Sequence, residues 1–475
     1  MKPSPLFLPS PLQKLIDYLH ESALRPLLVG GYVRDAIRGV YESKDIDIEV
    51  YGIASMDALE RVLSAYGAVN AVGKSYGVLK MRLEAWELDI ALPRVETKTA
   101  QGHKGFAVTV DASLDFATAA RRRDFGMNAI GYDPKAQQFL DPFGGIDAIA
   151  RGEIAHIDDV TFVEDPLRVL RAVGFAARFG YTIAPATLML CRSMVAQGML
   201  EELPIERIEG EYKKILLLSP KPSIAFGYLD AMSALPIELA QLKNTPQHPL
   251  YHPEGDVYVH TMMAIDAFVP LRCGDARKDF ALALAVLCHD MGKATTTRLI
   301  DGVLRAKGHE NEVQFAIAFL ARLTHDKALI EEVLTLVRLH GRPSQLYAQH
   351  ASDGAVRRLA TQVVIEDLVT VAKADFFGRT TPAALSGRYE AGEWLLERAS
   401  HLGVRHEGVA PYLKGRHLLA HGMQAGAHFA PILAQAYEAQ LEGEIVDEES
   451  AIVWLEVYLE REKMSNEGEK ILTKG

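Results

Sequence analysis

The sequence predicts an α+β fold in which a mixed amino-terminal part is followed by an all-helical remainder. From residue 26 to about 145, short β-like runs such as PLLVGG, DIDIEVYG and WELDIAL alternate with helical runs such as SMDALERVLSAYG. After about residue 150 the strand signals fade, and long helical patterns dominate to the carboxyl end. Strands mixed with helices and then helices alone indicate an α+β head joined to an all-α body.

Individual elements follow from the same patterns. Residues 11–24 are predicted to form an opening amphipathic helix, and LLVGGYVRDAIRG (27–39) predicts a strand, a Gly-Gly turn and a helix. The stretch NTPQHPLYHPEGD (244–256) is rich in proline and polar residues and predicts a linker before a new domain, with a second break near 380–388. The 475 residues are enough for roughly three domains.

Composition indicates a folded protein of the cytoplasm. The chain is 49% hydrophobic and 24% charged. No apolar stretch approaches the roughly 20 residues that cross a bilayer, and four prolines interrupt the first eleven residues where a signal peptide would need an apolar core. Cys191, Cys273 and Cys288 show neither metal spacing nor a disulfide framework, so we expect a reducing compartment and no membrane partner.

The charge balance matters for possible partners. A net charge of -11 argues against binding nucleic acid through bulk electrostatics. Residues 94–123 reverse this balance locally, because cationic side chains outnumber acidic ones there by six to three. The cations are Arg94, Lys98, Lys104, Arg121, Arg122 and Arg123, and the acids are Glu96, Asp111 and Asp115. A site for phosphates needs positive charge beside the phosphates more than a high isoelectric point.

The Gly-Gly turn is a candidate phosphate site. Gly30 and Gly31 would let the backbone approach a ligand closely, and the helix that follows would offer free N–H groups and a positive dipole end. Arg34, one turn into that helix, would add a charge-assisted contact. Taken alone, such a turn is more often only a turn.

The next predicted strand carries carboxylates that could bind metal ions beside the Gly-Gly turn. In KDIDIEVYG, alternation puts Asp45, Asp47 and Glu49 on one face and apolar residues on the other. Asp45 and Asp47 would stand close enough to share hard divalent cations, as two-metal phosphoryl transfer requires. Asp89, in another β-like run, could complete the set. The alternative is an exposed edge strand that carries surface acids.

Two further motifs suggest nucleotide contacts. In ARRRDFGMNAIGYD, three arginines precede an apolar run that we expect to be helical, and Arg123, Asp124 and Asn128 could meet a triphosphate and a ribose. The run FVEDPLRVLRAVGFAARFG (162–180) predicts a helix with Asp165 and Arg168 on one face. Such a pair is also common as an ordinary ion pair.

The Asp165–Arg168 pair also has the chemistry to recognise bases. Cytosine and adenine both present an exocyclic amine beside a ring-nitrogen acceptor, so one carboxylate and one guanidinium can accept both. Uracil and guanine present the reverse polarity and would mismatch. Unpaired bases are recognised through their edges in this manner.

These motifs, in this order, resemble those of the class II CCA-adding enzymes and their poly(A) polymerase relatives. The matching residues are VGGYVRD (29–35), DID (45–47), RRDFGMNA (122–129), DPFGG (141–145) and EDPLRVLR (164–171). The similarity runs from about residue 25 to beyond 375, most closely to bacterial forms with an HD domain. Gly174 departs from it, since some relatives have a nucleotide-contacting arginine there.

The resemblance implies a polymerase-β-like head over residues 1–150, a helical neck over 151–225, an HD domain over 244–385 and a helical tail over 390–475. It implies Mg²⁺ bound by Asp45 and Asp47, tRNA, ATP and CTP as partners, and base selection by protein side chains, which carries over onto Asp165 and Arg168. Gly31, Arg34, Arg123 and Arg171 would contact the incoming nucleotide.

A second metal site is expected in the helical part. FALALAVLCHDMGKATTT (280–297) ends a buried-looking helix with His289 and Asp290, the adjacent pair for which the HD phosphohydrolases are named. Other candidate ligands are His260, His309, His340 and Asp375, with His252 as a competitor of His340. Imidazole and carboxylate ligands suit Mn²⁺, Ni²⁺, Co²⁺ or Fe²⁺. The resemblance implies phosphatase or phosphodiesterase activity there.

Several alternatives stay open at this stage. An enzyme that adds only CC, only the final A or a poly(A) tail would share these motifs. A phosphohydrolase whose head only binds RNA or nucleotide belongs to a different class. The tail (411–459) predicts a turn and two or three amphipathic helices, with Asp447 as a helix cap. The resemblance to bacterial CCA-adding enzymes implies that this tail contacts the tRNA elbow. The sequence leaves monomer and homodimer equally open.

Overall fold

The computed structural model describes the chain except residues 1–2, 42–43, 71–76, 99–105, 112 and 473–475. The side chains of 95–98, 106–110 and 463–472 also lie outside the description, as do the predicted cations Lys98 and Lys104. The chain divides into two compact units, Met1–Leu235 and Pro236–Gly475. The unit boundary therefore precedes the predicted linker at 244–256, and the finer four-part division remains a prediction.

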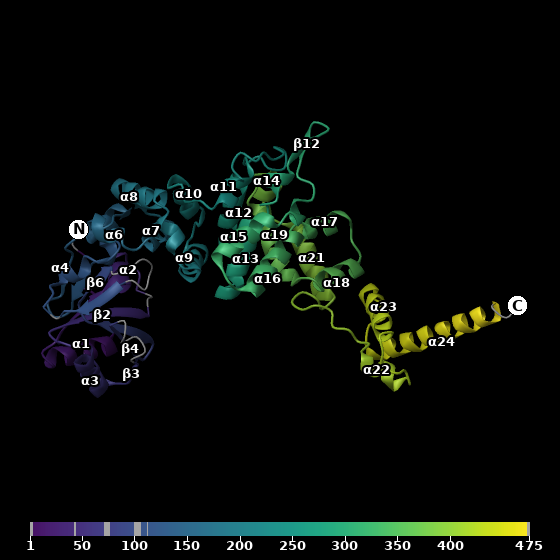
Figure 1. Ribbon diagram of the computed structural model, residues 1–475, viewed down its shortest axis with the longest axis horizontal. Helices are drawn as coiled ribbons and strands as arrows, with labels where there is room; N and C mark the ends of the chain where they lie inside the picture. Colours follow the sequence, from purple (N-terminus) through teal and green to yellow (C-terminus); the bar gives the residue numbers. More distant parts are fainter. Residues whose placement is uncertain (1–2, 42–43, 71–76, 99–105, 112, 473–475) are drawn as a thin grey trace. The chain divides into compact units, whose positions relative to one another are not determined.

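A mixed seven-stranded sheet organises the first unit, in the order β3-β4-β5-β2-β1-β8-β9 (Figure 1). Only β2 and β5 run parallel; the other neighbours in this sheet are antiparallel. The strands are β1 (Arg25–Val29), β2 (Asp45–Tyr51), β3 (Val69–Asn70), β4 (Val78–Leu83), β5 (Trp86–Ala91), β8 (Gly131–Asp133) and β9 (Gln138–Leu140), with β6 (Arg94–Lys98) and β7 (Phe106–Val110) forming a separate pair.

Strand β2 confirms the predicted alternation. Ile46, Ile48 and Val50 are at most 1% exposed and face the core, while the aspartates occupy the opposite face. Helix α1 (Ser10–Glu21) packs against β1 through fully buried Leu12 and Leu15, as expected for residues 11–24. Because the apolar side of β2 is packed into the core, the aspartates on its other side are held in fixed positions.

The remaining helices of the first unit follow the sheet or surround it. Figure 1 shows α1 and α3 on one side of the strands. The helices are α2 (Gly30–Ile37), α3 (Met56–Tyr66), α4 (Phe116–Ala120), α5 (Gly145–Arg151), α6 (Asp159–Phe162), α7 (Leu167–Phe179), α8 (Pro185–Ala196), α9 (Ile205–Leu218) and α10 (Ser223–Ala231).

Two helix predictions are corrected here. The expected helix at 162–180 begins only at Leu167, because Pro166 lacks an N–H group and disfavours helical backbone at Asp165. The Asp165 carboxylate instead accepts the Leu167 N–H at 3.1 Å. The apolar run after the arginine triplet forms only a single 3₁₀ turn, η2 (Gly126–Asn128), and then enters β8. Both changes place the motif residues at loop–helix junctions, where side chains can converge.

The second unit is built around a helix that is buried over most of its length. Every residue of α13 (Ala276–Cys288) from Asp279 onward is buried, and α12, α16 and α19 pack around it (Figure 1). The other helices up to residue 401 are α11 (Ile237–Ala240), α12 (Val257–Phe268), α14 (Lys293–Thr296), α15 (Gln314–Leu323), α16 (Lys327–Leu339), α17 (Arg342–Ala348), α18 (Asp353–Ala360), α19 (Ile365–Phe377), α20 (Pro382–Leu385) and α21 (Glu390–His401).

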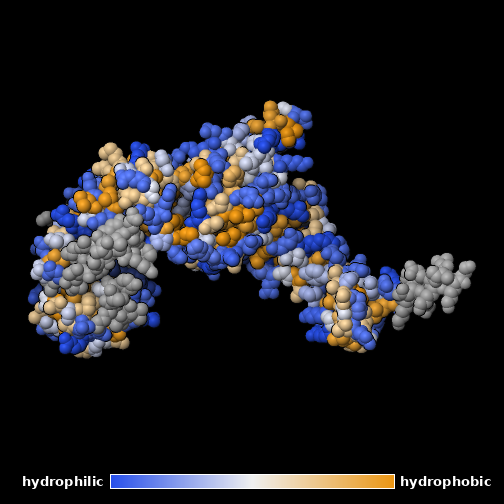
Figure 2. All heavy atoms as spheres, in the orientation of Figure 1, coloured by the Kyte–Doolittle hydropathy of each residue, from blue (hydrophilic) through white to orange (hydrophobic). Residues whose placement is uncertain are grey.

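The expectation of helices alone after residue 150 fails in two places. Strands β10 (Glu153–Ile154) and β11 (Thr182–Ile183) form a short parallel pair. A hairpin of β12 (Arg298–Ile300) and β13 (Val303–Arg305) interrupts the second unit, and its two-residue Asp301–Gly302 turn has positive φ at both positions. This turn chemistry is typical of a tight hairpin. Leu299 is 70% exposed on this hairpin, and Figure 2 shows hydrophobic residues at the hairpin's outer end.

The carboxyl-terminal helices form a small core of their own. Helices α22 (Gly415–Ala420), α23 (Phe429–Glu442) and α24 (Glu448–Leu472) bury Leu418, Ile432 and Leu455 against one another. Asp447 accepts the Ser450 N–H at 2.8 Å and so caps α24 as predicted. In the described part of the chain, none of the helices is both long and apolar enough to cross a membrane. All three cysteines are free.

Gly145 gives a test of the close packing of α5 against the 3₁₀ turn η2. A Cβ atom at Gly145 would lie 2.2 Å from the Gly126 carbonyl oxygen, so the backbone itself would have to move. We expect Gly145→Ala to destabilise the unit by about 3 kcal/mol and to lower its melting temperature by roughly 6–12 °C. Gly144 is the matched control: it has φ +68° but open space around it, so Gly144→Ala should cost only about 1 kcal/mol. Calorimetry of the full chain would compare them, and equal shifts would contradict the packing argument.

Candidate functional site

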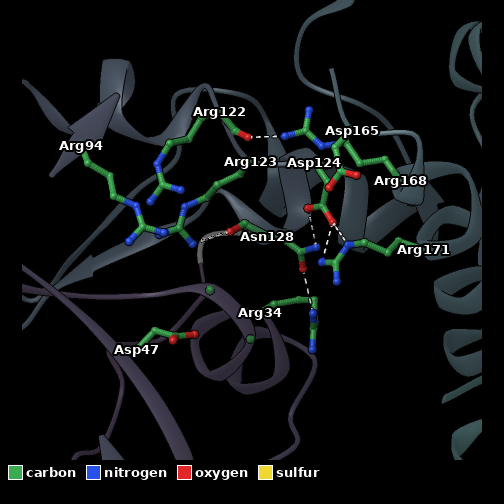
Figure 3. Close-up of a pocket in the computed structure, with 12 residues that line it drawn as sticks. Arg34, Asp47, Arg94, Arg122, Arg123, Asp124, Asn128, Asp165, Arg168 and Arg171 are labelled. Carbon is green, nitrogen blue, oxygen red and sulfur yellow. Dashed lines mark hydrogen bonds and ion pairs between the residues drawn. The ribbon is translucent and has the colours of Figure 1, made fainter. Parts of the chain in front are cut away.

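A pocket of about 520 Å³ opens in the first unit, where the start of α2, strand β2, the segment 121–128 and the start of α7 meet. Figure 3 draws its lining, which includes nine predicted nucleotide-binding residues and the catalytic candidate Asp47. The lining residues are Gly30, Gly31, Arg34, Asp47, Arg94, Arg122, Arg123, Asp124, Asn128, Asp165, Arg168 and Arg171. Arg94 and Arg122 are additions to the predicted site.

The three predicted catalytic carboxylates share one face of the sheet. The parallel register of β2 and β5 sets Asp47 directly beside Asp89, and Asp45 lies two residues away on the same face. Burial raises the pKa of the Asp47 carboxyl; Arg123 opposes this shift, and Asp89 and Asp45 add to it. Lys80 contacts Asp89 with its ammonium group 2.9 Å from the carboxylate. Carboxylates held this close repel each other, and a divalent cation would relieve the repulsion.

Gly30 brings the backbone against this acidic face. Its φ of +72° is a left-handed conformation, and a Cβ atom there would lie 2.7 Å from the Asp47 Oδ2 atom. Helix α2 begins at the same residue, so its first N–H groups border the pocket beside the carboxylates. The predicted close approach at the Gly-Gly turn is therefore present, with Asp47 as the group approached.

A chain of polar contacts crosses the pocket from α2 to α7. Arg34 donates to the Asn128 side-chain oxygen at 2.7 Å, Asn128 donates to Asp124 at 2.9 Å, and the Arg171 Nε donates to Asp124 at 2.7 Å (Figure 3). Arg171 and Asn128 outweigh the burial of Asp124 and lower the pKa of its carboxyl. The pairing fixes both arginines while part of each guanidinium still borders the pocket.

An aromatic ring supports both of these arginines from below. The guanidinium carbons of Arg34 and Arg171 each lie 5.3 Å from the centre of the Phe175 ring. Phe175 meets Phe125 edge to face at 5.8 Å, which ties the ring into the core. Sequence reasoning missed Phe175, although its place one helical turn after Arg171 on α7 was a usable signal.

Asp165 and Arg168 both line the pocket, but they do not pair with each other as an i,i+3 helix pair would. Arg168 donates to the backbone carbonyls of Thr161 at 2.6 Å and Arg122 at 2.5 Å. Asp165 accepts from Arg207 on α9 at 2.9 Å. Each group is thus held in a fixed orientation by its own partner. Arg207 is a residue that the sequence could not identify, because it lies 42 positions away in no recognised motif.

The second unit brings all six predicted metal ligands together. They come from α12 (His260), the end of α13 (His289 and Asp290), the turn η5 at His309–Asn311, the end of α16 (His340) and α19 (Asp375). His260, His289 and Asp290 are at most 1% exposed. The structure places His340 in this cluster, whereas its competitor His252 turns its Nδ1 atom to Glu254 at 2.9 Å.

Each histidine of the cluster has one nitrogen committed to an acceptor outside it. The Nδ1 atoms of His289, His309 and His340 donate to the carbonyls of Val286, Ala306 and Val337 at 2.7, 2.8 and 2.7 Å. The Nδ1 atom of His260 donates to the carboxylate of Glu254 at 2.8 Å. Because a carbonyl oxygen can only accept, these contacts leave Nε2 facing the cluster, as in metal-binding histidines.

Charge and donor chemistry in this cluster fit a transition metal. His289 and Lys293 outweigh burial and hold the pKa of Asp290 well below its usual value, and Arg379 and His260 do the same for Asp375. Burial and the neighbouring His289 lower the pKa of His340 to about 4, so this imidazole is neutral at pH 7. Nitrogen and carboxylate ligands in one buried cluster suit Mn²⁺, Fe²⁺, Co²⁺ or Ni²⁺.

A cavity of about 290 Å³ lies beside this cluster, with His309 in its lining. Its lining includes the cationic side chains of Lys293, Arg305 and Arg379. The segment 244–256, predicted as a linker, supplies much of the remaining wall, including Pro246, Gln247, His248, Tyr251 and His252. Its proline-rich composition predicted only a linker and not a cavity wall. A segment without regular secondary structure can still be held in place by its contacts.

Comparisons with known proteins agree with this architecture. A family model described as the poly A polymerase head domain matches residues 27–155. Similar solved structures include the CCA-adding enzyme of Bacillus stearothermophilus in complex with CTP (TM-score 0.65, 20% identity, 97% of this chain and 100% of that one). Another is the Thermotoga maritima CCA-adding enzyme complexed with tRNA (TM-score 0.57, 18% identity, 95% and 96% covered). At these identities the likeness shows the fold.

Relatives by sequence carry the name multifunctional CCA protein. The Xylella fastidiosa protein is 37% identical over 283 residues, 58% of this chain, and the match spans 64% of that relative's length. The Cupriavidus metallidurans protein is 36% identical over 324 residues, covering 66% of this chain and 74% of the relative. The Nitrosomonas eutropha protein is 33% identical over 363 residues, covering 74% and 83%. With identity above 30% across more than two thirds of the last two relatives, this chain belongs to the multifunctional CCA protein family.

Proposed function

We propose that the first unit adds C, C and A to the 3′ end of tRNA from CTP and ATP without a nucleic-acid template. The observation that carries this proposal is the position of Asp45, Asp47 and Asp89 on one sheet face, against a glycine turn and a pocket rich in arginine. The names of the relatives and of the solved neighbours support the same activity. Transfer of a nucleotide to an RNA 3′-hydroxyl requires this combination of acids beside a triphosphate site.

Each group of the pocket has a role in nucleotidyl transfer. Mg²⁺ held by Asp45 and Asp47, with Asp89 beside them, would activate the attacking hydroxyl and neutralise charge on the departing pyrophosphate. The side chains of Arg94, Arg122 and Arg123 gather on one side of the pocket, where they would hold the triphosphate (Figure 3). The 3′-hydroxyl attacks the α-phosphate and pyrophosphate leaves.

Base selection falls to the other end of the pocket. Asp165 would accept the exocyclic amine of cytosine or adenine, and Arg168 would donate to the adjacent ring nitrogen. The two backbone carbonyls that hold Arg168, and the Arg207 contact that holds Asp165, limit how far either group can turn toward the reversed pattern of uracil or guanine. Fixed partners of this kind give selectivity without a template.

We infer a second activity, metal-dependent phosphoester hydrolysis, in the second unit. The six converging ligands and the cationic cavity beside them support it. A bound transition metal would lower the pKa of its water and so supply a nucleophile at neutral pH. Lys293, Arg305 and Arg379 would hold the phosphate in the cavity, and the resemblance to HD phosphohydrolases points to RNA ends as substrates. We place both activities in the cytoplasm, with tRNA as the shared partner.

Extension of three RNA substrates tests the first proposal. We would incubate tRNA ending at the discriminator base, at C or at CC with Mg²⁺ and CTP, ATP or both, and size the products at single-nucleotide resolution. Growth by three nucleotides that then stops is the expected result. Stopping after CC, or adding only A to the CC end, would identify a partial enzyme, and an open-ended ladder with ATP would identify a poly(A) polymerase. No extension would leave the second unit as the active part.

Replacing Asp47 by Asn should remove nucleotide addition. The substitution takes away a metal-binding charge at the centre of the acidic face, so we expect kcat to fall by about 10³-fold or more, several kcal/mol of transition-state stabilisation. Phosphohydrolysis by the second unit should be unchanged. Asp57→Asn on the exposed start of α3 is the control and should retain full addition. Addition at the normal rate by Asp47→Asn would disprove the metal role.

Arg207→Gln should weaken base selection more than turnover. Without the charge-assisted contact to Asp165, the carboxylate can rotate, and we expect the ratio of kcat/KM for CTP over UTP to fall about tenfold, equivalent to about 1.4 kcal/mol. Arg192→Gln, which removes a backbone contact to Ala231 away from the pocket lining, should leave the ratio unchanged. If Arg207→Gln lowers kcat for all four nucleotides equally, its contact is structural and not selective.

A further inference from the structure

We propose that Glu49 is a positioning residue for nucleotide addition, which holds the guanidinium groups of Arg122 and Arg123 in the orientation that binds the triphosphate. The sequence places Glu49 on the acidic face of its strand but gives it no role there. This role rests on the proposed nucleotidyl transfer, because it concerns two of the arginines that we expect to hold the triphosphate. All the residues involved belong to the first unit.

Glu49 is buried behind the pocket. It lies two residues beyond Asp47 on the same face of β2, between β1 and β5, and it is only 2% exposed. Arg122 and Arg123 line the pocket, whereas Glu49 is not among the described residues that do so. Its carboxylate can therefore affect a bound nucleotide only through the side chains that lie between them.

Tyr51 anchors one oxygen of this carboxylate to the core. The Tyr51 hydroxyl donates to Glu49 Oε2 at 3.0 Å, and the Tyr51 ring packs in a core cluster with Leu27 and Val29. Burial and the neighbouring Glu49 raise the pKa of Tyr51, so its hydroxyl stays protonated and remains a donor. The other oxygen, Oε1, accepts from Arg123 Nη2 at 3.2 Å. The carboxylate is thus fixed on one side and holds an arginine on the other.

Two guanidinium groups share the Oε1 atom of Glu49. Arg122 Nη2 lies 3.5 Å from it, beside the contact from Arg123, and Figure 3 shows both arginines at one side of the pocket. Arg123 also donates through Nη1 to the Asn128 carbonyl at 3.1 Å, so two contacts fix its plane. The Glu49 charge offsets the repulsion between the two cations. One carboxylate cannot neutralise both, so positive charge remains for a triphosphate.

The alternative role for Glu49 is a further metal ligand beside Asp45 and Asp47. Both of its oxygens, however, already accept hydrogen bonds, one from Tyr51 and one from Arg123. A metal ion at this carboxylate would also lie against guanidinium groups, which would repel it. The contacts therefore assign Glu49 to the arginines and leave metal binding to the aspartates.

Glu49→Gln in the full chain removes the charge and keeps the shape of the side chain. We expect the affinity for α,β-methylene-CTP, measured by calorimetry with Mg²⁺, to fall about tenfold, because the two guanidinium groups lose the charge that holds them together. Affinity for CMP, which lacks the β- and γ-phosphates, should be nearly unchanged. In steady-state addition, KM for CTP and ATP should rise by a similar factor while kcat stays near its original value.

Two further variants complete the test. Tyr51→Phe keeps the Glu49 charge but removes its anchor, so affinity for the analogue should fall by a smaller factor, about threefold. Glu153→Gln is the matched control, because it breaks a glutamate–arginine contact at 2.8 Å with Arg151 outside the pocket lining, and it should bind like the unchanged chain. Circular dichroism would verify folding. If Glu49→Gln does not fold, Tyr51→Phe decides, and unchanged affinity in it would overturn the role of Glu49.

Several results with Glu49→Gln would overturn the positioning role. Unchanged affinity for the analogue would do so, and higher affinity would mean that Glu49 competes with the triphosphate for the arginines. Equal losses for the analogue and CMP would indicate general damage to the pocket, and a changed Mg²⁺ requirement at unchanged nucleotide affinity would indicate a metal ligand. Binding of the analogue requires no turnover, so a chain that adds no nucleotides would overturn the proposed function while the binding data still decide the role of Glu49.

Discussion

The constraint on which both units depend is that groups which repel one another are held at close range by rigid elements. In the first unit, the register of β2 and β5 brings three carboxylates onto one sheet face. In the second, the ends of packed helices turn imidazole nitrogens and carboxylates toward one point. Neither arrangement is stable by itself. In each unit the apolar core supplies the free energy that keeps these groups together: the buried face of β2 in the first, and the buried length of α13 in the second.

Cationic side chains of the chain itself neutralise part of this charge. Lys80 contacts Asp89, Arg171 pairs with Asp124, and in the second unit Lys293 and Arg379 contact Asp290 and Asp375. Several of these cations also border a cavity, so the groups that stabilise the acids are placed where a phosphate would bind. Stability and ligand binding therefore use the same side chains, and removing one is expected to affect both.

Much of the site was predictable because it depends on local patterns. Alternation in β2 predicted the acidic face, the Gly-Gly turn predicted the close approach, and the His289–Asp290 pair predicted the cluster. Arg207 and Glu254 were not predictable, because each acts through a contact distant in sequence or within a segment that composition marks as a linker. Two errors were avoidable. Pro166 signals a helix start, and Asp301–Gly302 signals a hairpin within the helical region.

The ring of Phe175 couples the positions of two arginines in the pocket. Its ring lies under Arg34 from α2 and under Arg171 from its own helix, and Arg168 lies in the first turn of the same helix α7. One helix therefore carries Arg168, at the end of the pocket proposed to select the base, together with Arg171 and the ring that supports Arg34. A small rotation of α7 that reshapes the base end would shift both guanidinium groups in concert. If these two guanidinium groups hold the nucleotide, as the family resemblance implies, the position of the nucleotide would depend on which base is bound.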